Sequence, residues 1–189
     1  MRLFVALDIP EDVRAAIAAV AAKLRRVCEH ARWVRIEGAH VTLKFIGEVP
    51  AEKIEQIKTA LANVSFPGAL RIFFRGIGFF PNGRRPSVLW AGVEACPELR
   101  ALAASVENSL EPLGIARERR EFSPHLTLAR FKSPDKLEGL RAAVAAAAPL
   151  EFGNAVANEF HLYQSVLKPG GAEYTRLATF TGAGSTEIS

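Results

Sequence analysis

His40-Val41-Thr42-Leu43 and His125-Leu126-Thr127-Leu128 have the same pattern: histidine, an aliphatic residue, threonine and leucine. Threonine and valine favour strands, and alternate side chains of a strand share a face. Each motif therefore predicts a strand that buries its two aliphatic side chains and presents an imidazole and a hydroxyl on the opposite face. The motif occurs twice, in matching strand contexts.

The segments around the two motifs alternate between strand and helix patterns. Apolar residues at three- and four-residue steps predict helices, whereas short apolar runs bounded by Pro and Gly predict strands. Ser133 is expected to cap the fourth helix, with Pro134 at its first position. The pattern indicates an α+β fold. We expect strands at 3–9, 33–36, 40–46, 69–80, 87–93, 125–131, 160–167 and 174–180, and helices at 13–27, 54–64, 97–110 and 134–144.

Composition and length limit the classes of protein to which the chain can belong. It has 189 residues, of which 49% are hydrophobic and 23% charged, so it can bury a core and is not disordered. No apolar run approaches the ~20 residues of a membrane helix, and the start of the chain does not resemble a signal peptide. Two cysteines cannot form a disulfide scaffold. The length allows one domain or two small lobes that share a core. We expect a cytoplasmic protein whose domain spans 1–181, with a loose C-terminal tail at 182–189.

The positive charge is modest but clustered. Lys and Arg exceed Asp and Glu by 24 to 20, which gives a formal net charge of +4. A solvated basic face is one interpretation, and phosphate recognition is the other, because guanidinium groups match phosphate oxygens in pairs. The arginines concentrate in two stretches, at 71–85 and 117–130.

The repeated motif suggests a chemistry. Near neutral pH one histidine can accept a proton while a second donates one, and threonine hydroxyls can donate hydrogen bonds to phosphate oxygens. If the two strands flank one cleft, His40, Thr42, His125 and Thr127 form a set suited to displacement at phosphorus. One His-x-Thr sequence would mean little, since most strand histidines are structural, but two matched copies favour function.

A zinc site is the main rival interpretation. Two histidines are too few ligands for zinc, and no third ligand stands at a suitable spacing. The remaining histidines, His30 and His161, lack the motif and are expected to be structural or exposed. We therefore expect no metal and no cofactor.

The two tetrapeptides resemble the paired HxTx motifs of the 2H phosphoesterase superfamily. Their surroundings are similar to those of its RNA 2′,3′-cyclic phosphodiesterase family, also called 2′-5′ RNA ligase. The resemblance covers nearly the whole chain and includes five further stretches: Arg2-Leu3-Phe4-Val5-Ala6-Leu7, Trp33-Val34, Leu89-Trp90-Ala91-Gly92-Val93, Phe122-Ser123-Pro124 and Leu162-Tyr163-Gln164-Ser165.

That resemblance implies a fold and a reaction. The fold would have two pseudo-symmetric lobes, each an antiparallel sheet flanked by helices, around a central cleft. The reaction would open a terminal RNA 2′,3′-cyclic phosphate to a 2′-phosphate, and attack by a 5′-hydroxyl would give 2′-5′ ligation. In family terms His40 would be the proton donor and His125 the proton acceptor. The residues alone leave this assignment open, since a pseudo-symmetric pair works in either direction.

Three residues near the motifs are further candidates for substrate binding. Arg130 could bind phosphate, although strict alternation places it on the core side unless a bulge intervenes. Lys44 shares parity with His40 and is either a ligand or solvated. Phe45 could stack on a base, but its parity favours the core.

Two other functions compete with this prediction. A 2H phosphoesterase for a small cyclic nucleotide would have the same catalytic groups and different base contacts. A non-catalytic RNA-end binding module would keep the cleft without turnover. For all three we expect no membrane partner and a monomer.

Overall fold

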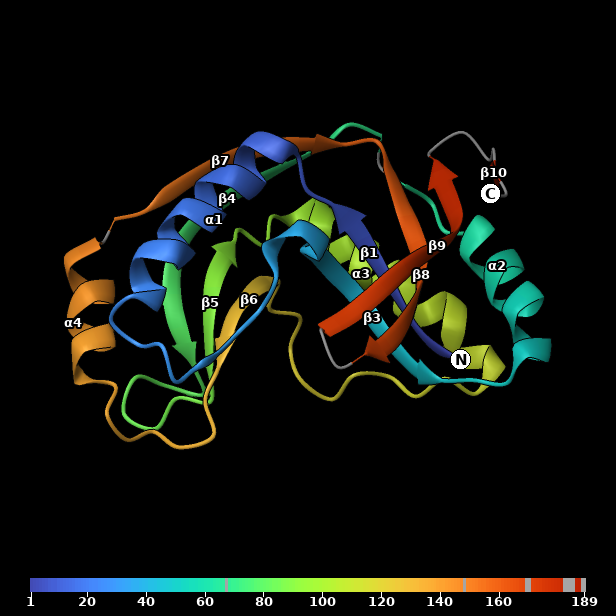
Figure 1. Ribbon diagram of the computed structural model, residues 1–189. Helices are drawn as coiled ribbons and strands as arrows, with labels where there is room; N and C mark the ends of the chain where they lie inside the picture. Colours follow the sequence, from blue (N-terminus) through green and yellow to red (C-terminus); the bar gives the residue numbers. More distant parts are fainter. Residues whose placement is uncertain (67, 148, 169–170, 182–185, 188–189) are drawn as a thin grey trace.

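Two antiparallel sheets form the two halves of the molecule (Figure 1). The structure, a computed structural model, describes residues 1–66, 68–147, 149–168, 171–181 and 186–187. The first sheet has the strand order β10-β9-β8-β1-β3, and the second has the order β2-β6-β5-β4-β7. Helices flank both sheets, which confirms the predicted α+β class with two lobes.

The elements of each lobe come from separated parts of the chain. The first lobe contains β1 (Arg2–Asp8), β3 (His40–Glu48), β8 (Glu159–Lys168), β9 (Gly171–Thr181), β10 (Thr186–Glu187), α2 (Ile54–Ala62) and α3 (Pro97–Leu110). The second contains β2 (Arg32–Trp33), β4 (Leu70–Phe80), β5 (Val88–Val93), β6 (His125–Arg130), β7 (Glu151–Ala157), α1 (Glu11–Arg25) and α4 (Glu138–Ala147).

The two lobes exchange helices. Helix α1 follows β1 of the first sheet but packs on β7 of the second. There Gly153 leaves room for the helix: a Cβ atom on it would lie 3.2 Å from Val13 Cγ2. Helix α3 follows β5 of the second sheet but packs on β3 of the first. Neither lobe is therefore a continuous stretch of chain.

The buried faces of the helices follow the predicted spacing. In α1 the buried residues include Val13, Ile17 and Leu24, and in α3 they include Leu99 and Val106. These side chains join the apolar strand residues in the core, which removes their surface from water and supplies the main stabilising free energy.

Three expectations about the elements need correction. Strand β7 was not predicted, because its apolar and polar residues do not alternate and it contains Gly153, which has a φ of 120°. Helix α4 begins at Glu138 rather than Pro134, since Lys136 has a φ of 57° and interrupts the helix. The expected strand at 33–36 is only the two-residue β2. Of the predicted loose tail, 182–185 and 188–189 lie outside the described residues, while Thr186 and Glu187 pair with β9.

Candidate active site

The two motifs begin the two strands that bring the lobes together. His40 is the first residue of β3, and His125 is the first residue of β6. The two strands belong to different sheets, yet they contact each other. In both motifs the histidine and threonine are partly exposed and the two aliphatic residues are buried. The predicted division of the two faces is confirmed.

Both strands carry a bulge directly after the motif threonine. Against β1, the register steps from Thr42 to Lys44, which leaves Leu43 as the extra residue. Against β5, it steps from Thr127 to Ala129, which leaves Leu128 extra. An extra residue reverses the alternation beyond it. Two consecutive residues are consequently buried in each strand, and the residue after them returns to the exposed face.

The bulges correct the expected facing of Lys44 and Phe45. Lys44 was expected on the face of His40 but is buried, whereas Phe45 was expected in the core but is 49% exposed. Arg130 needed a bulge to reach the histidine face; the bulge is present, and Arg130 is exposed. Phe45 and Arg130 thus occupy the same position in the two copies of the motif.

A backbone carbonyl fixes the imidazole of each motif histidine. The Nδ1 atom of His40 lies 2.9 Å from the carbonyl oxygen of Gly38, and Nδ1 of His125 lies 2.8 Å from that of Ser123. A carbonyl has no proton to give, so each Nδ1 must carry the proton and donate. The neutral form of each ring therefore has its acceptor lone pair on Nε2. Both copies use the carbonyl two residues before the histidine, a contact that the sequence did not predict.

His40 lies among aromatic rings of its own sheet. Its ring stacks on Phe4 at a centroid distance of 4.4 Å, meets the edge of Tyr174 at 5.0 Å, and lies 6.1 Å from Tyr163. This burial lowers the pKa of His40 below its ordinary value, and the Gly38 carbonyl and the Asp8 carboxylate partly offset the effect.

Asp8 belongs to a polar cluster beside His40. It is the residue opposite His40 in the β1–β3 register. Its carboxylate accepts a hydrogen bond of 2.6 Å from the Tyr163 hydroxyl and another from the guanidinium of Arg176. Burial and the bond to Asp8 raise the pKa of Tyr163 to about 12, so it remains a donor. The sequence did not predict this cluster, because its members come from three strands.

The remaining motif-free histidine of this sheet has a structural position. His161 is 1% exposed, and its Nδ1 lies 3.0 Å from the hydroxyl of Thr179. Its Nε2 is 3.6 Å from carboxylate oxygens of both Asp8 and Glu159. Burial outweighs these carboxylates and lowers the pKa of His161.

His125 lies in a more open setting. It lines a pocket of about 310 Å³ with Phe80, Trp90 and Gly92, among other residues. The ring of Phe80 meets that of His125 edge-on at 5.0 Å. Only glycine fits at position 92 without a shift of the backbone, because a Cβ there would lie 2.2 Å from the carbonyl oxygen of Arg75.

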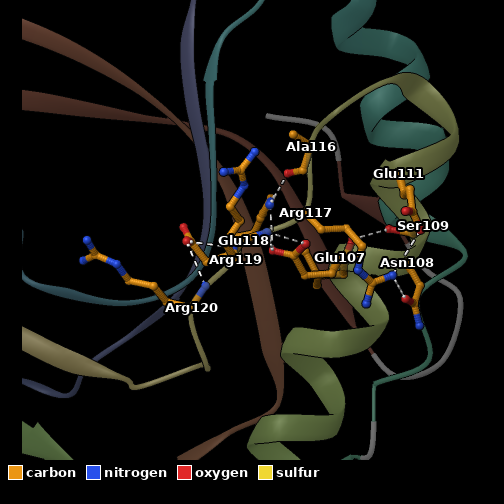
Figure 2. A network of polar contacts seen from close by, with 11 residues as sticks. Glu107, Asn108, Ser109, Glu111, Ala116, Arg117, Glu118, Arg119 and Arg120 are labelled. Atoms are coloured by element: carbon orange, nitrogen blue, oxygen red, sulfur yellow. Dashed lines mark hydrogen bonds and ion pairs between the residues drawn. The ribbon is translucent and has the colours of Figure 1, made fainter.

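Lys44 joins three parts of the first lobe, and Figure 2 shows two of its partners, Glu107 and Ala116. Its ammonium group lies 2.7 Å from Glu107 of α3 and donates a 2.7 Å hydrogen bond to the Ala116 carbonyl. Glu107 also accepts from the backbone N–H of Glu118 at 3.2 Å. The ammonium group is thus bonded inside the fold, which argues against a substrate contact. Instead, Lys44 ties β3 to the segment that leads to His125.

The part of the chain that the structure describes contains no candidate metal centre. Within the described ranges, no three His, Cys, Asp or Glu side chains gather as a metal site would require. None of the helices in that part of the chain has the length and apolar character needed to cross a membrane.

Comparisons with known proteins relate this chain to one family. A family model described as LigT-like phosphoesterase matches residues 7–90 and 92–174. The chain belongs to the LigT-like phosphoesterase family. The resemblance inferred from the paired motifs is thereby confirmed.

Curated relatives match nearly the whole chain. An Archaeoglobus fulgidus protein named RNA 2′,3′-cyclic phosphodiesterase is 37% identical over 95% of this chain and 99% of its own length. A Methanocaldococcus jannaschii protein of the same name is 33% identical over 92% and 96%.

Solved structures agree with this LigT-like assignment. TT0787 of Thermus thermophilus superposes with a TM-score of 0.78 at 33% identity, covering 96% of this chain and 97% of that one. Escherichia coli LigT in complex with 3′-AMP gives a TM-score of 0.74 at 26% identity, covering 96% and 98%.

Proposed function

We propose that this protein is an RNA 2′,3′-cyclic phosphodiesterase that works without a metal ion. The observation that carries the proposal is the matched anchoring of His40 and His125. Each Nδ1 proton is held by the carbonyl two residues before the histidine, and the strands that the two histidines begin contact each other. Each Nε2 is left to exchange a proton with substrate. The curated names of the relatives from A. fulgidus and M. jannaschii support the same substrate class.

The reaction is a displacement at the cyclic phosphorus. Nε2 of His125 accepts a proton from water as its oxygen bonds to phosphorus. The bond from phosphorus to the 3′-oxygen breaks, and Nε2 of His40 donates a proton to that oxygen. The products are a 2′-phosphate and a free 3′-hydroxyl. The hydroxyls of Thr42 and Thr127 donate hydrogen bonds to the non-bridging oxygens, where negative charge accumulates. A 5′-hydroxyl in place of water would give a 2′-5′ linkage.

The burial of His40 bears on its role as proton donor. With its pKa lowered, the free enzyme holds His40 mostly neutral near pH 7. The bound cyclic phosphate is an anion, and an adjacent negative charge favours the protonated imidazole. Substrate binding and Asp8 therefore both act to charge His40 for donation.

We further propose that Phe45 and Arg130 contact the nucleotide. Both follow a bulge that turns them to the histidine face, one from each lobe. An exposed phenylalanine offers a stacking surface for a base, and a guanidinium offers paired donors to a phosphate. We expect a cytoplasmic monomer acting on RNA ends; two free cysteines are typical of a reducing compartment.

The decisive experiment incubates the purified protein, in EDTA, with a short RNA that ends in a 2′,3′-cyclic phosphate. We expect a 2′-phosphate product, and a loss of about 10²–10⁴-fold in rate for His40→Ala and for His125→Ala. His30→Ala is the matched control, since His30 lies outside both motifs. Chelator-sensitive activity would favour the zinc alternative. Turnover of small cyclic nucleotides alone, or binding without turnover, would favour the other two functions.

A further inference from the structure

A second hollow lies apart from the histidines. A pocket of about 690 Å³ lies between the β4–β5 turn and the segment that joins β6 to α4. Figure 1 shows these two loops side by side at one end of the second lobe. Its lining includes Arg84 and Arg85 from the first loop, and Phe131, Lys132 and Lys136 from the second.

The pocket has positive charge that the fold does not neutralise. In the part of the chain that the structure describes, the side chains of Arg84, Arg85, Lys132 and Lys136 are exposed and make no hydrogen bond or ion pair. Of the two carboxylates in the lining, Glu138 lies 3.5 Å from Arg141, and Asp135, which accepts from the Ser133 hydroxyl, is one negative charge against these four cations. The available charge is therefore cationic.

The walls of the pocket are held in place by hydrogen bonds. Arg141 donates to the carbonyl oxygens of Gly83 at 2.7 Å, Arg84 at 3.1 Å and Pro134 at 3.3 Å, so that one guanidinium links both loops. Within the turn, the side-chain oxygen of Asn82 accepts from the backbone N–H groups of Arg84 and Arg85. The backbone that carries the cations is consequently fixed before any ligand arrives, which lowers the entropic cost of binding.

Strand β6 connects this pocket to the candidate active site. The strand starts at His125 and ends at Arg130, and the pocket begins at the next residue, Phe131. Six residues of strand span roughly 20 Å. Arg130 lies between the two sites and is exposed. An extended polyanion held at His125 could pass Arg130 and reach the pocket.

We propose that this pocket binds the phosphodiester backbone of the RNA strand upstream of its reacting end. The inference rests on the proposed function for the identity of the polymer. Cations that lack counter-charges suit a chain of phosphates, and Phe131, partly exposed at the pocket edge, adds a ring on which a base can stack. The pocket gives the enzyme affinity for long RNA and takes no part in the chemical step.

The test compares two substrates. One is a nucleoside 2′,3′-cyclic monophosphate, which is too short to reach the pocket, and the other is an RNA of roughly 12 nucleotides with the same cyclic end, a length within the range of single-strand sites. For Arg84→Ala/Arg85→Ala we expect KM for the RNA to rise about tenfold, with kcat unchanged and KM for the mononucleotide unchanged. The slope of log KM for the RNA against log salt should fall by about 0.7 for each phosphate that is no longer neutralised by an arginine.

A matched control removes two charges elsewhere. Lys58→Ala/Arg71→Ala deletes one cation from α2 and one from the start of β4, neither of which lines the pocket. It should leave KM for the RNA unchanged. An equal effect of both double variants, or an equal effect on both substrates, would overturn the inference. So would a loss of binding for inorganic phosphate or ATP without any loss for RNA, since the pocket would then be a site for free anions.

Failure of the proposed function is distinguishable from failure of this inference. If the wild-type protein hydrolyses neither substrate, the proposed function fails. The pocket is then judged by equilibrium binding of the fluorescently labelled RNA, for which the Arg84→Ala/Arg85→Ala variant should bind about tenfold more weakly than the wild type. Equal binding would refute the pocket as an RNA site.

Discussion

The two copies of the motif agree at the histidine and the threonine and differ around them. Both present an imidazole fixed through Nδ1, a threonine two residues later and a bulge after it. The first copy is on the edge strand β3, whereas the second is on β6, between β5 and β2. His40 is enclosed by three rings, and His125 lines an open pocket. The comparison indicates that the repeat sets reactive geometry, and the surroundings set the properties of each histidine.

The second difference lies beyond the bulge. Where the first copy buries Lys44, the second buries Ala129, and where the first exposes Phe45, the second exposes Arg130. One copy thus contributes an internal ion pair and an aromatic surface, and the other contributes a small core residue and a cation. Four sets of substitutions, in the two copies and in the residues around His40, test these differences.

Substitution of Lys44 should give the largest change in the free energy of unfolding. Lys44→Met leaves Glu107 without its counter-charge and should lower the free energy of unfolding by on the order of 3 kcal/mol. Urea denaturation measures the effect. Adding Glu107→Leu to Lys44→Met should recover much of the loss, because no unpaired charge then remains. If the single and double variants are equally destabilised, the ion pair is not what joins β3 to α3.

The threonines test whether the two copies share the phosphate equally. Thr42→Val and Thr127→Val each remove one hydrogen-bond donor and should each lower kcat by about 10²–10³-fold, with little change in stability. Thr59→Val, in α2 and outside both motifs, is the control. A normal rate in one variant would show that only one copy binds the charged oxygens.

Asp8 distinguishes the proton donor from the proton acceptor. The Asp8 carboxylate raises the pKa of His40, so Asp8→Asn should lower it further. If His40 donates the proton, the alkaline limb of the kcat profile shifts to lower pH while the acid limb stays. A shift of the acid limb alone would reverse the roles of His40 and His125. Circular dichroism should confirm that the variant, which also alters the bonds of Tyr163 and Arg176, remains folded.

The buried histidines of the first lobe predict a pH dependence of stability. The pKa values of His40 and His161 are lowered in the folded protein, so the unfolded chain binds more protons at mildly acidic pH. Their contribution to stability is present above about pH 6.5 and is lost as pH falls through the lower folded values. The variant His161→Asn should show a shallower decline below about pH 6.5 in urea titrations. An unchanged slope would mean that His161 is not buried in its neutral form.

The sequence predicted the repeated motif and the elements whose apolar residues recur at regular spacing. The motif strands, the helix faces and the pairing of histidine with threonine follow from local spacing, and the structure has them. The alternation rule failed at Lys44 and Phe45, because a bulge is a property of the register between two strands and not of either strand alone. Strand β7 was missed for a related reason, since Gly153 interrupts its alternation opposite a register shift in β4.

The candidate site was predicted only in part. Histidine and threonine pairs carry a visible signal, whereas the cluster around Asp8 unites β1, β8 and β9 and has no signature within any one of them. The same holds for the pocket beyond β6, because its arginines and lysines come from two loops that are distant in the sequence and share one wall only in the fold.

The exchange of helices between the lobes affects how the molecule unfolds and what proteolytic cleavage can release from it. Helix α1 packs on the sheet that does not contain the preceding strand, β1, and helix α3 packs on the sheet that does not contain the preceding strand, β5. A single backbone cleavage near the middle of the chain therefore cannot release an intact half. Each fragment would carry a helix whose apolar face has lost its sheet. Limited proteolysis should therefore yield either the complete chain or small peptides. The two motif histidines should come together, and separate, in one cooperative transition.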